Sequence, residues 1–365
     1  MIITIVAGAR PNFMKIAPII DAIKNKKQQG FEIDFRLVHT GQHYDKNLSD
    51  TFFEELNIPF PDVNLEVKSG TQAEQTAAIM IGFEKDLKEN PTDLVLVVGD
   101  VTSTMACAIV AKKEGVKVAH VEAGIRSGDL RMPEEINRMV TDSLTDYFFT
   151  TSTYANSNLK KLGFSDDQIF FVGNVMIDTL RKNEERLKQP NLWKDLGLEE
   201  KKYMVMTLHR PSNVDEEQQL KALISQIVTL GKDYTIIFPV HPRTKKLLQD
   251  LDLNFENLHY VNPLGYLEFN YLVKNAFAVL TDSGGITEET TVMNVPCITL
   301  RENTERPETC VIGTNVLVGN DPEKIKDNFK TLLAGNWKKG QIPELWDGKA
   351  AQRIINQLVK IYHLD

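Results

Sequence analysis

Short apolar, β-rich runs alternate with segments of helical periodicity along the whole chain of 365 residues. Runs of this kind are typical of strands in a parallel α/β sheet, because such strands are buried on both faces. One set of predicted strands comprises residues 2–6, 33–38, 94–98, 116–121, 147–149 and 169–172. A second set of comparable size comprises residues 203–208, 234–238, 258–261, 276–280, 297–300 and 315–318. The pattern predicts two doubly wound α/β domains.

We expect an N-terminal domain at residues 1–175 and a C-terminal domain at residues 176–349. Between the two sets of strands, residues 178–202 are rich in Lys, Glu, Asn and Gln and include Pro190, which indicates a helical and loop connection. The final segment places Ile354, Ile355, Leu358 and Ile361 on one helical face. An apolar helix face must be buried, so we expect the helix within residues 350–365 to pack back on the first domain.

The stretch 281–289, Thr-Asp-Ser-Gly-Gly-Ile-Thr-Glu-Glu, follows a predicted strand and opens a predicted helix. Glycines allow a sharp turn and close approach to a ligand, and a helix N-terminus offers unpaired N–H groups to a phosphate. Ser283, Gly284 and Gly285 are therefore candidate phosphate-binding residues, and Glu288 and Glu289 are candidate acceptors for sugar hydroxyls. A tight βα turn without a ligand explains the same glycines.

Acidic residues follow two strands of the first domain. Asp100 and Glu122 both come directly after a predicted strand, and Glu134 and Arg138 share a helix face after Pro133. Ligands of open α/β sheets bind beyond the carboxyl ends of the strands, so the three acids are candidates for acid–base chemistry. The alternatives are that Asp100 caps the helix beginning at Thr102, and that Glu134 and Arg138 form a surface ion pair.

Basic residues also stand near strand ends. His209 follows the first strand of the second domain and is suited to proton transfer or to polarising a departing phosphate, although a structural imidazole is the alternative. Arg10 and Lys15 follow the first strand and would reach a diphosphate, unless Lys15 lies on a solvated helix face. Arg306, in the charged run 301–308, is placed to clamp an anion.

Composition restricts the class of partner. Hydrophobic content of 42% and charged content of 25% are typical of a globular protein, and the net charge of −8 argues against nucleic acid or an anionic membrane. The three cysteines lack metal-ligand spacing and indicate buried free thiols in a reducing compartment. The N-terminus indicates a first strand, not a signal peptide, and no stretch approaches a membrane span. No dinucleotide or P-loop glycine motif follows any strand, so the pattern favours a nucleotide-sugar enzyme.

Seven segments together resemble the non-hydrolysing UDP-N-acetylglucosamine 2-epimerases. They occur in the right order over nearly the whole chain, at residues 8–11, 99–100, 120–126, 133–138, 209–210, 282–289 and 304–308. The resemblance implies two Rossmann-like domains of the glycosyltransferase-B type with the active site in the interdomain cleft. It also implies a cytoplasmic homodimer that serves cell-envelope polysaccharide biosynthesis and needs neither nicotinamide nor metal.

The resemblance further implies reversible conversion of UDP-N-acetylglucosamine to UDP-N-acetylmannosamine through a 2-acetamidoglucal. Roles carried over by matching position make Asp100, Glu122 and Glu134 the catalytic carboxylates, supported by Arg138 and His209. The residues expected to hold the UDP portion are Arg10, Lys15, Ser283, Gly284, Gly285, Glu289 and Arg306, with Glu289 on the ribose.

Gln42 and His43 match the segment that binds a second substrate molecule as activator in some bacterial members, but Tyr44 and Asp45 depart from that pattern. The same segment is similar to relatives that act on UDP-diacetamido-uronic acids or 6-deoxy sugars, so a modified UDP-2-acetamido sugar is an alternative substrate. A glycosyltransferase of the same fold, a hydrolysing epimerase and a non-catalytic nucleotide-sugar sensor are the rival functions.

Overall fold

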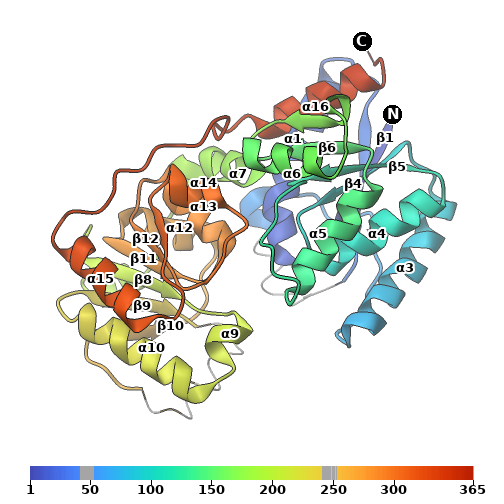
Figure 1. Ribbon diagram of the computed structural model, residues 1–365. Coiled ribbons are helices and arrows are strands. Elements are labelled where there is room, and N and C mark those ends of the chain that lie inside the picture. The colour runs from blue at the N-terminus through green and yellow to red at the C-terminus, as the bar shows by residue number, and fades with distance from the viewer. Residues whose placement is uncertain (42–52, 241–247, 249–250, 252, 365) are drawn as a thin grey trace. The chain divides into compact units, whose positions relative to one another are not determined.

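The computed structural model describes residues 1–41, 53–240, 248, 251 and 253–364, without the side chains of Arg10, Pro211 and Ser212 (Figure 1). The chain divides into two compact units. Unit 1 comprises Met1–Lys182 and Glu344–Asp365, and unit 2 comprises Asn183–Pro343.

Unit 1 is built on a seven-stranded parallel sheet of order β3-β2-β1-β4-β5-β6-β7. Its strands are β1 Ile2–Ala7, β2 Asp34–His39, β3 Val63–Asn64, β4 Leu94–Val98, β5 Lys117–Val121, β6 Tyr147–Thr150 and β7 Ile169–Phe171. Every residue of β4 is buried, because helices cover both faces of the sheet.

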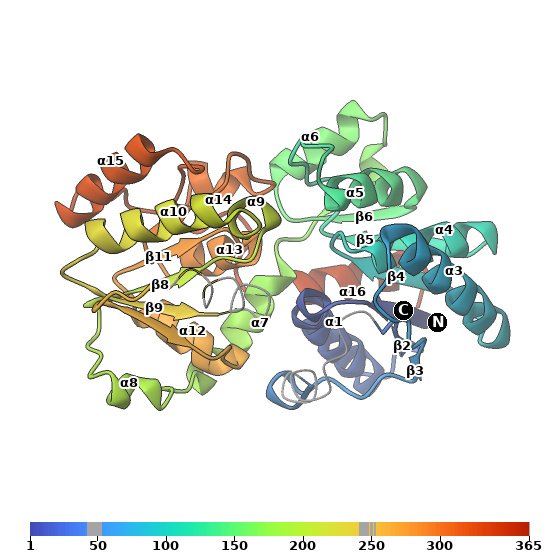
Figure 2. The same ribbon diagram turned by 90° about the horizontal axis from the view of Figure 1, so that it is seen from below.

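The helices of unit 1 connect successive strands. They are α1 Arg10–Gln28, α3 Gln72–Glu89, α4 Thr102–Lys113, α5 Pro133–Leu144, α6 Thr153–Lys161, α7 Val175–Asn183 and α16 Ala350–Ile361, with a 3₁₀ turn at Asp166–Gln168. In Figures 1 and 2, α3, α4 and α5 follow one another, while α16 lies against α1 although the two helices come from opposite ends of the chain. The buried face of α16 includes Ile354, Ile355 and Leu358, as the sequence predicts.

Unit 2 is built on a six-stranded parallel sheet of order β10-β9-β8-β11-β12-β13. Its strands are β8 Tyr203–Thr207, β9 Thr235–Pro239, β10 Leu258–Val261, β11 Ala278–Thr281, β12 Cys297–Thr299 and β13 Asn315–Leu317. Its helices are α8 Leu192–Asp195, α9 Pro211–Val214, α10 Glu217–Leu230, α12 Tyr266–Asn275, α13 Gly284–Val292, α14 Pro307–Val311 and α15 Pro322–Leu333, with a 3₁₀ turn at Glu184–Arg186.

Both faces of the unit 2 sheet are packed. Met204 and Met206 belong to one apolar cluster, which includes buried residues of α10 and α15. Tyr203 and Val205 alternate with them and belong to the other cluster, which includes residues of α12. Successive side chains of a strand point to opposite faces, so burial on both faces explains the continuous apolar run.

Each sheet has a topological switch point, where the strand order reverses from one side to the other. In unit 1 it lies between β1 and β4, and in unit 2 between β8 and β11. Loops that leave two such strands run apart and leave a crevice at their carboxyl ends, where open α/β sheets bind ligands. The segments to examine are therefore the turns after β1, β4, β8 and β11.

The predicted fold class, two doubly wound parallel sheets, is confirmed. The two-residue strand β3 was not predicted, because it is too short for alternation to be visible. The expectation that all three cysteines are buried is wrong for Cys310, which is only partly buried. The domain limits 1–175 and 176–349 stay a prediction. In the described part of the chain, no helix has the length and apolar character needed to cross a membrane.

Candidate functional site

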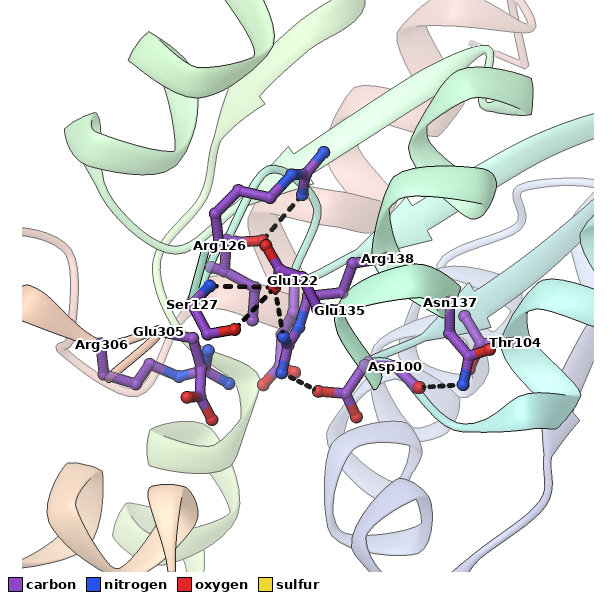
Figure 3. A network of polar contacts seen from close by, with 12 residues as sticks. Asp100, Thr104, Glu122, Arg126, Ser127, Glu135, Asn137, Arg138, Glu305 and Arg306 are labelled. Carbon is purple, nitrogen blue, oxygen red and sulfur yellow. Dashed lines mark hydrogen bonds and ion pairs between the residues drawn. The ribbon is translucent and has the colours of Figure 1, made fainter. Parts of the chain in front are cut away.

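Asp100 stands in the turn between β4 and α4, at the switch point of unit 1. Its carboxylate forms an ion pair with Arg138 of α5, with Nη2 and Oδ2 2.5 Å apart. Asn137, also on α5, donates its side-chain amide to the backbone carbonyl of Asp100 at 2.9 Å. The N-cap of α4 is Val101, without a side-chain cap. Asp100 is therefore held by α5, the next helix along the chain, through both its carboxylate and its backbone (Figure 3).

Glu122 directly follows β5, the neighbour of β4. Its side chain is fully buried, and its Oε2 lies 2.5 Å from Nζ of Lys15 on α1. Glu122 has a φ of 68°, a left-handed conformation that a residue with a side chain adopts only at a cost. Such strained residues cluster at functional sites, where the surrounding structure holds them. A Cβ at Gly99 would lie 2.8 Å from Nζ of Lys15 and 3.5 Å from Oε2 of Glu122, so only glycine fits there.

Arg138 is fully buried and joins two carboxylates. Its Nη1 donates to Oε2 of Glu135 at 2.7 Å, while its Nη2 reaches Asp100. Glu135 also accepts hydrogen bonds from the backbone N–H groups of Ser127 and Gly128. Burial alone would raise the pKa of Glu135, but these hydrogen bonds and Arg138 hold it below its ordinary value. The chain Glu135–Arg138–Asp100, visible in Figure 3, fixes the direction of the Asp100 carboxylate.

The structure shows less of the contacts of the remaining candidates of unit 1. Glu134 is partly exposed in the first turn of α5. Arg10 begins α1 after β1, but its side chain lies outside the described residues. Gln42 and His43 also lie outside the described residues.

In unit 2, His209 and Asp282 meet across the switch point between β8 and β11. Nδ1 of His209 lies 2.8 Å from Oδ1 of the fully buried Asp282, while the histidine side chain is 46% exposed. Asp282 also accepts from the backbone N–H of Arg210 and the side chain of Asn213, each at 3.0 Å. Burial opposes ionisation, but the hydrogen bonds from His209, Arg210 and Asn213 outweigh it and lower the pKa of Asp282. A carboxylate at Nδ1 fixes the tautomer and leaves Nε2 for chemistry.

The predicted phosphate turn forms the N-terminus of α13. Ser283 is the N-cap residue, and Gly284 and Gly285 are the first helical residues, all partly exposed. A Cβ at Gly284 would lie 2.8 Å from Oε1 of Glu305, so the glycine allows the loop after β12 to approach. Glu305 in turn is paired with Arg301 at 2.7 Å. The N-terminus of α13 directly follows β11, one of the two strands at the switch point of unit 2, which is the position that an anion site at a helix N-terminus requires.

Arg306 and Glu288 form a buried ion pair between Nε and Oε1. The guanidinium predicted to clamp an anion is therefore engaged with the first of the two glutamates of α13. Glu289, the second, accepts from Nδ2 of Asn270 at 3.4 Å and lies beside Tyr266. Burial raises the pKa of Glu289 to about 7, although hydrogen bonds from Tyr266 and Asn270 work in the opposite direction.

Glu308 lies in the first turn of α14, close to the same ion pair. It is 7% exposed, and in the described part of the chain neither of its carboxyl oxygens accepts a hydrogen bond from another residue. Burial raises the pKa of Glu308 to about 7, and the charges of Glu288 and Glu305 act in the same direction, against Arg306. Unit 2 thus has two buried carboxyl groups that are partly protonated near neutral pH.

Sequence reasoning missed the residues that hold the candidates in place. They are His120, Glu135, Asn137 and Asp142 of unit 1, and Asn213, Tyr266, Asn270, Asp282, Glu305 and Glu308 of unit 2. Asp282 had a local signal, because it directly follows a strand next to the glycine turn. Glu308 belongs to the charged run that indicated Arg306. No group of three or more His, Cys, Asp or Glu side chains suited to a metal ion occurs among the described residues.

Three comparisons describe what this chain is similar to. The family model described as UDP-N-acetylglucosamine 2-epimerase matches residues 24–359. A UDP-N-acetylglucosamine 2-epimerase of Methanocaldococcus jannaschii is 41% identical, over 98% of this chain and 99% of the relative. A UDP-2,3-diacetamido-2,3-dideoxy-D-glucuronate 2-epimerase of Pseudomonas aeruginosa is 37% identical, over 99% of each chain.

The solved structures agree with the sequence comparisons. A crystal structure of the Methanocaldococcus jannaschii enzyme in complex with UDP-GlcNAc and UDP superposes with a TM-score of 0.88, at 41% identity, covering 99% of this chain and 100% of that one. The likeness extends to both units and gives the chain the glycosyltransferase-B-like fold of that structure.

Proposed function

Because the chain belongs to the UDP-N-acetylglucosamine 2-epimerase family, we propose that it interconverts UDP-N-acetylglucosamine and UDP-N-acetylmannosamine by elimination and re-addition of UDP. One observation carries the proposal beyond family membership. At the carboxyl ends of neighbouring strands in unit 1, Asp100 and Glu122 are buried or half-buried carboxylates, each held by a cation from a helix. Groups so fixed are suited to proton transfer at carbon, because their geometry is set before substrate binds.

The order of bond changes follows from the acidity of the substrate. The hydrogen on C2 has no neighbouring carbonyl, so a carboxylate alone would face a very high barrier to its removal. Cleavage of the C1–O bond, with the electron pair leaving on UDP, makes C1 cationic and acidifies the C2–H bond. Loss of that proton to a carboxylate then gives the 2-acetamidoglucal. Protonation of C2 from the opposite face and return of the UDP oxygen to C1 give the epimer.

We assign the proton transfers to Asp100, Glu122 and Glu134. Arg138 supports Asp100 by fixing the direction of its carboxylate. Lys15 would fix the carboxylate of Glu122 in the same way, through the 2.5 Å contact between them. The sequence assigned Lys15 to the diphosphate, so Lys15 has two candidate roles that an experiment can separate. The proposal requires no nicotinamide, because the proton leaves and returns at the same carbon without net oxidation, and it assigns no step to a metal.

In unit 2, we assign the UDP portion to Ser283, Gly284, Gly285, Glu289 and Arg306, with Arg10 of unit 1. The N-terminus of α13 favours the diphosphate, and Glu289 would accept hydrogen bonds from the ribose hydroxyls. His209, with Nδ1 held by Asp282, would face the departing diphosphate oxygen with Nε2 and would donate to it when both ring nitrogens carry hydrogen. The interdomain cleft stays a prediction, and so does an activator site at Gln42 and His43.

A modified UDP-2-acetamido sugar is the second candidate substrate. The 37% identity with a diacetamido-glucuronate 2-epimerase over the whole chain favours its inclusion. The same elimination serves both substrates, because the reacting atoms C1, C2 and the 2-acetamido group are shared. We further propose that the enzyme acts as a cytoplasmic homodimer in cell-envelope polysaccharide synthesis. Light scattering after gel filtration tests the dimer.

The experiment is incubation of the purified protein with UDP-N-acetylglucosamine alone, followed by NMR of the sugar products. The proposal predicts a stable mixture with UDP-N-acetylmannosamine, approached from either side. Free N-acetylmannosamine with UDP would indicate a hydrolysing enzyme instead, and turnover only with an added acceptor would indicate a glycosyltransferase. A parallel incubation with diacetamido-uronic and 6-deoxy UDP-sugars ranks the substrates by kcat/KM.

A further inference from the structure

His120 is a buried histidine of unit 1 that the proposed reaction does not use. It lies on β5, two residues before Glu122, and none of its side chain is exposed. Nδ1 lies 2.7 Å from Oδ1 of Asp142 on α5, and Nε2 lies 2.8 Å from the backbone carbonyl of Gly99. The imidazole therefore bridges α5 and the turn after β4, which carries Asp100.

Both groups that contact the His120 ring can only accept hydrogen bonds. The Gly99 carbonyl has no hydrogen to give, and Asp142 is a carboxylate. Burial alone would raise the pKa of Asp142, but His120 and Arg126 lower it below its ordinary value. The other oxygen of Asp142 faces Arg126 at 2.6 Å and the backbone N–H of Gly124 at 3.1 Å. Two acceptors require two ring N–H groups, so the geometry makes His120 an imidazolium.

The carbonyl that His120 holds belongs to a crowded turn. Gly99 has a φ of 66°, and a side chain there would strike Nζ of Lys15. The peptide that follows this carbonyl leads directly into Asp100. A rotation of the Gly99–Asp100 peptide would therefore move the Asp100 carboxylate away from Arg138 and press on the Lys15–Glu122 pair.

Helix α5 thus reaches this turn by three routes. Asn137 binds the Asp100 carbonyl, Arg138 binds the Asp100 carboxylate, and Asp142 acts through His120 on the Gly99 carbonyl. We propose that His120 is a positioning residue, a buried imidazolium that sets the direction of the Gly99–Asp100 peptide and thereby of the Asp100 carboxylate. The inference rests on the proposed epimerase activity for its kinetic test, but not for its spectroscopic one.

A role in stability alone is a poor explanation of this pair. Buried ion pairs often stabilise a protein no better than apolar residues of the same size, because desolvation offsets their attraction. A role in stability alone would also not require Nε2 of His120 to contact the carbonyl of Gly99, the residue that precedes Asp100. The two explanations differ in what they predict for variants that keep one ring contact and lose the other.

The first test uses the unaltered protein with ¹⁵N-labelled histidine. Nitrogen NMR distinguishes an imidazolium, in which both ring nitrogens carry hydrogen, from the two neutral tautomers. Because both ring nitrogens of His120 face acceptors, we expect one buried histidine, whose ring N–H protons exchange slowly with solvent, to show hydrogen on both ring nitrogens. A neutral signature for this histidine overturns the inference, whatever the enzyme's activity.

The second test compares His120→Gln with His120→Asn. The longer Gln amide keeps a donor near the position of Nε2, toward Gly99, whereas the Asn amide keeps a donor near the position of Nδ1, toward Asp142. We expect kcat to fall about 10²-fold in His120→Asn but only about tenfold in His120→Gln, since small misplacements of a reacting group cost about this much. The KM for UDP-N-acetylglucosamine and the affinity for UDP should change less than about threefold in both variants.

The control is His363→Asn, an exposed residue near the C-terminus, which should leave kcat unchanged. Equal losses of kcat in the two His120 variants, or losses that follow their melting temperatures, overturn the positioning role. If neither variant folds, the NMR result on the unaltered protein decides alone. An unaltered protein that fails to epimerise contradicts the proposed function, while the NMR result still stands or falls by itself.

Discussion

The two units place buried acids in opposite electrostatic settings. In unit 1, Asp100, Glu122, Glu135 and Asp142 each lie within ion-pair distance of a lysine or arginine side chain. In unit 2, Arg301 and Arg306 are paired with Glu305 and Glu288, and burial raises the pKa of two further acids, Glu289 and Glu308, to about 7. Every acid of the unit 1 set therefore has a lysine or arginine partner, whereas in the described part of unit 2 neither Glu289 nor Glu308 forms an ion pair of this kind.

The difference corresponds to the two tasks we propose. Proton transfer at carbon needs carboxylates fixed in one geometry, and opposing cations provide that fixation. Binding of a diphosphate needs a pocket that does not repel it, and acids held neutral by burial reduce that repulsion. Near neutral pH, partial protonation of Glu308, which is not assigned to the ribose, therefore makes the unit 2 crevice less negative than its composition suggests.

The largest expected effect is loss of turnover on neutralising a unit 1 acid. Asp100→Asn or Glu122→Gln should lower kcat by about 10²- to 10⁴-fold, the usual contribution of a general acid or base. The affinity for UDP, measured by calorimetry, should stay unchanged, because UDP is assigned mainly to unit 2. The matched control is Glu84→Gln, an exposed acid on α3. Unchanged kcat in both variants would contradict the assignment of these two acids, and binding of the UDP-sugar without any turnover in the unaltered protein would indicate a non-catalytic sensor.

Next in size is an effect of Glu308 on stability. Its native pKa of about 7 exceeds the ordinary 4.5, so the native state binds more protons between these values and unit 2 loses stability as pH rises through them. Glu308→Gln should raise the unfolding free energy at about pH 8 by up to about 3 kcal/mol, and by nothing near pH 4. Denaturant unfolding at the two pH values measures this, with the exposed Glu323→Gln as control. A destabilised variant at the higher pH would mean that the carboxylate is well paired.

A smaller effect separates the two roles of Lys15. If Lys15 serves Glu122, Lys15→Met should lower kcat by about tenfold or more and leave UDP affinity unchanged. If it serves the diphosphate, UDP affinity falls instead. Binding and single-turnover measurements on the same variant distinguish the two, and Lys15→Arg, which keeps the charge, should recover part of the lost UDP affinity in the second case.

The smallest effect concerns pH and substrate binding. Ribose hydroxyls donate stronger hydrogen bonds to an ionised Glu289 than to the neutral carboxyl group, so affinity for UDP-N-acetylglucosamine should rise by about tenfold between about pH 6 and about pH 8, across its pKa of about 7. Glu289→Gln should abolish this dependence. Glu308→Gln is the matched comparison and should keep it. A pH-independent affinity in the unaltered protein would remove Glu289 from the ribose.

The strand ends were predictable, and their partners were not. Apolar runs located β4, β5, β8 and β11, and the rule that ligands bind at strand ends then indicated Asp100, Glu122, His209 and the glycine turn. The partner of Glu122 lies 107 residues away in sequence, on α1. Nothing local shows such a pairing, so Lys15 was assigned to the diphosphate.

His120 shows the same limit from another side. In sequence it is one position of a buried strand, and only the structure brings it to Asp142, 22 residues away. Glu289 and Glu308 were visible as acids, but their raised pKa values depend on burial and on neighbours from several elements. The sequence shows that these acids are present, whereas their pKa values depend on how the folded chain packs around them.

The most direct test of the account is the fate of hydrogen at C2. The unaltered protein is incubated with UDP-N-acetylglucosamine in D₂O, without any acceptor, and the H2 signals of both epimers are followed by NMR. Proton removal and return through carboxylates predicts that UDP-N-acetylmannosamine forms with deuterium at C2. Formation of the epimer with hydrogen retained at C2, or no reaction at all, would contradict it.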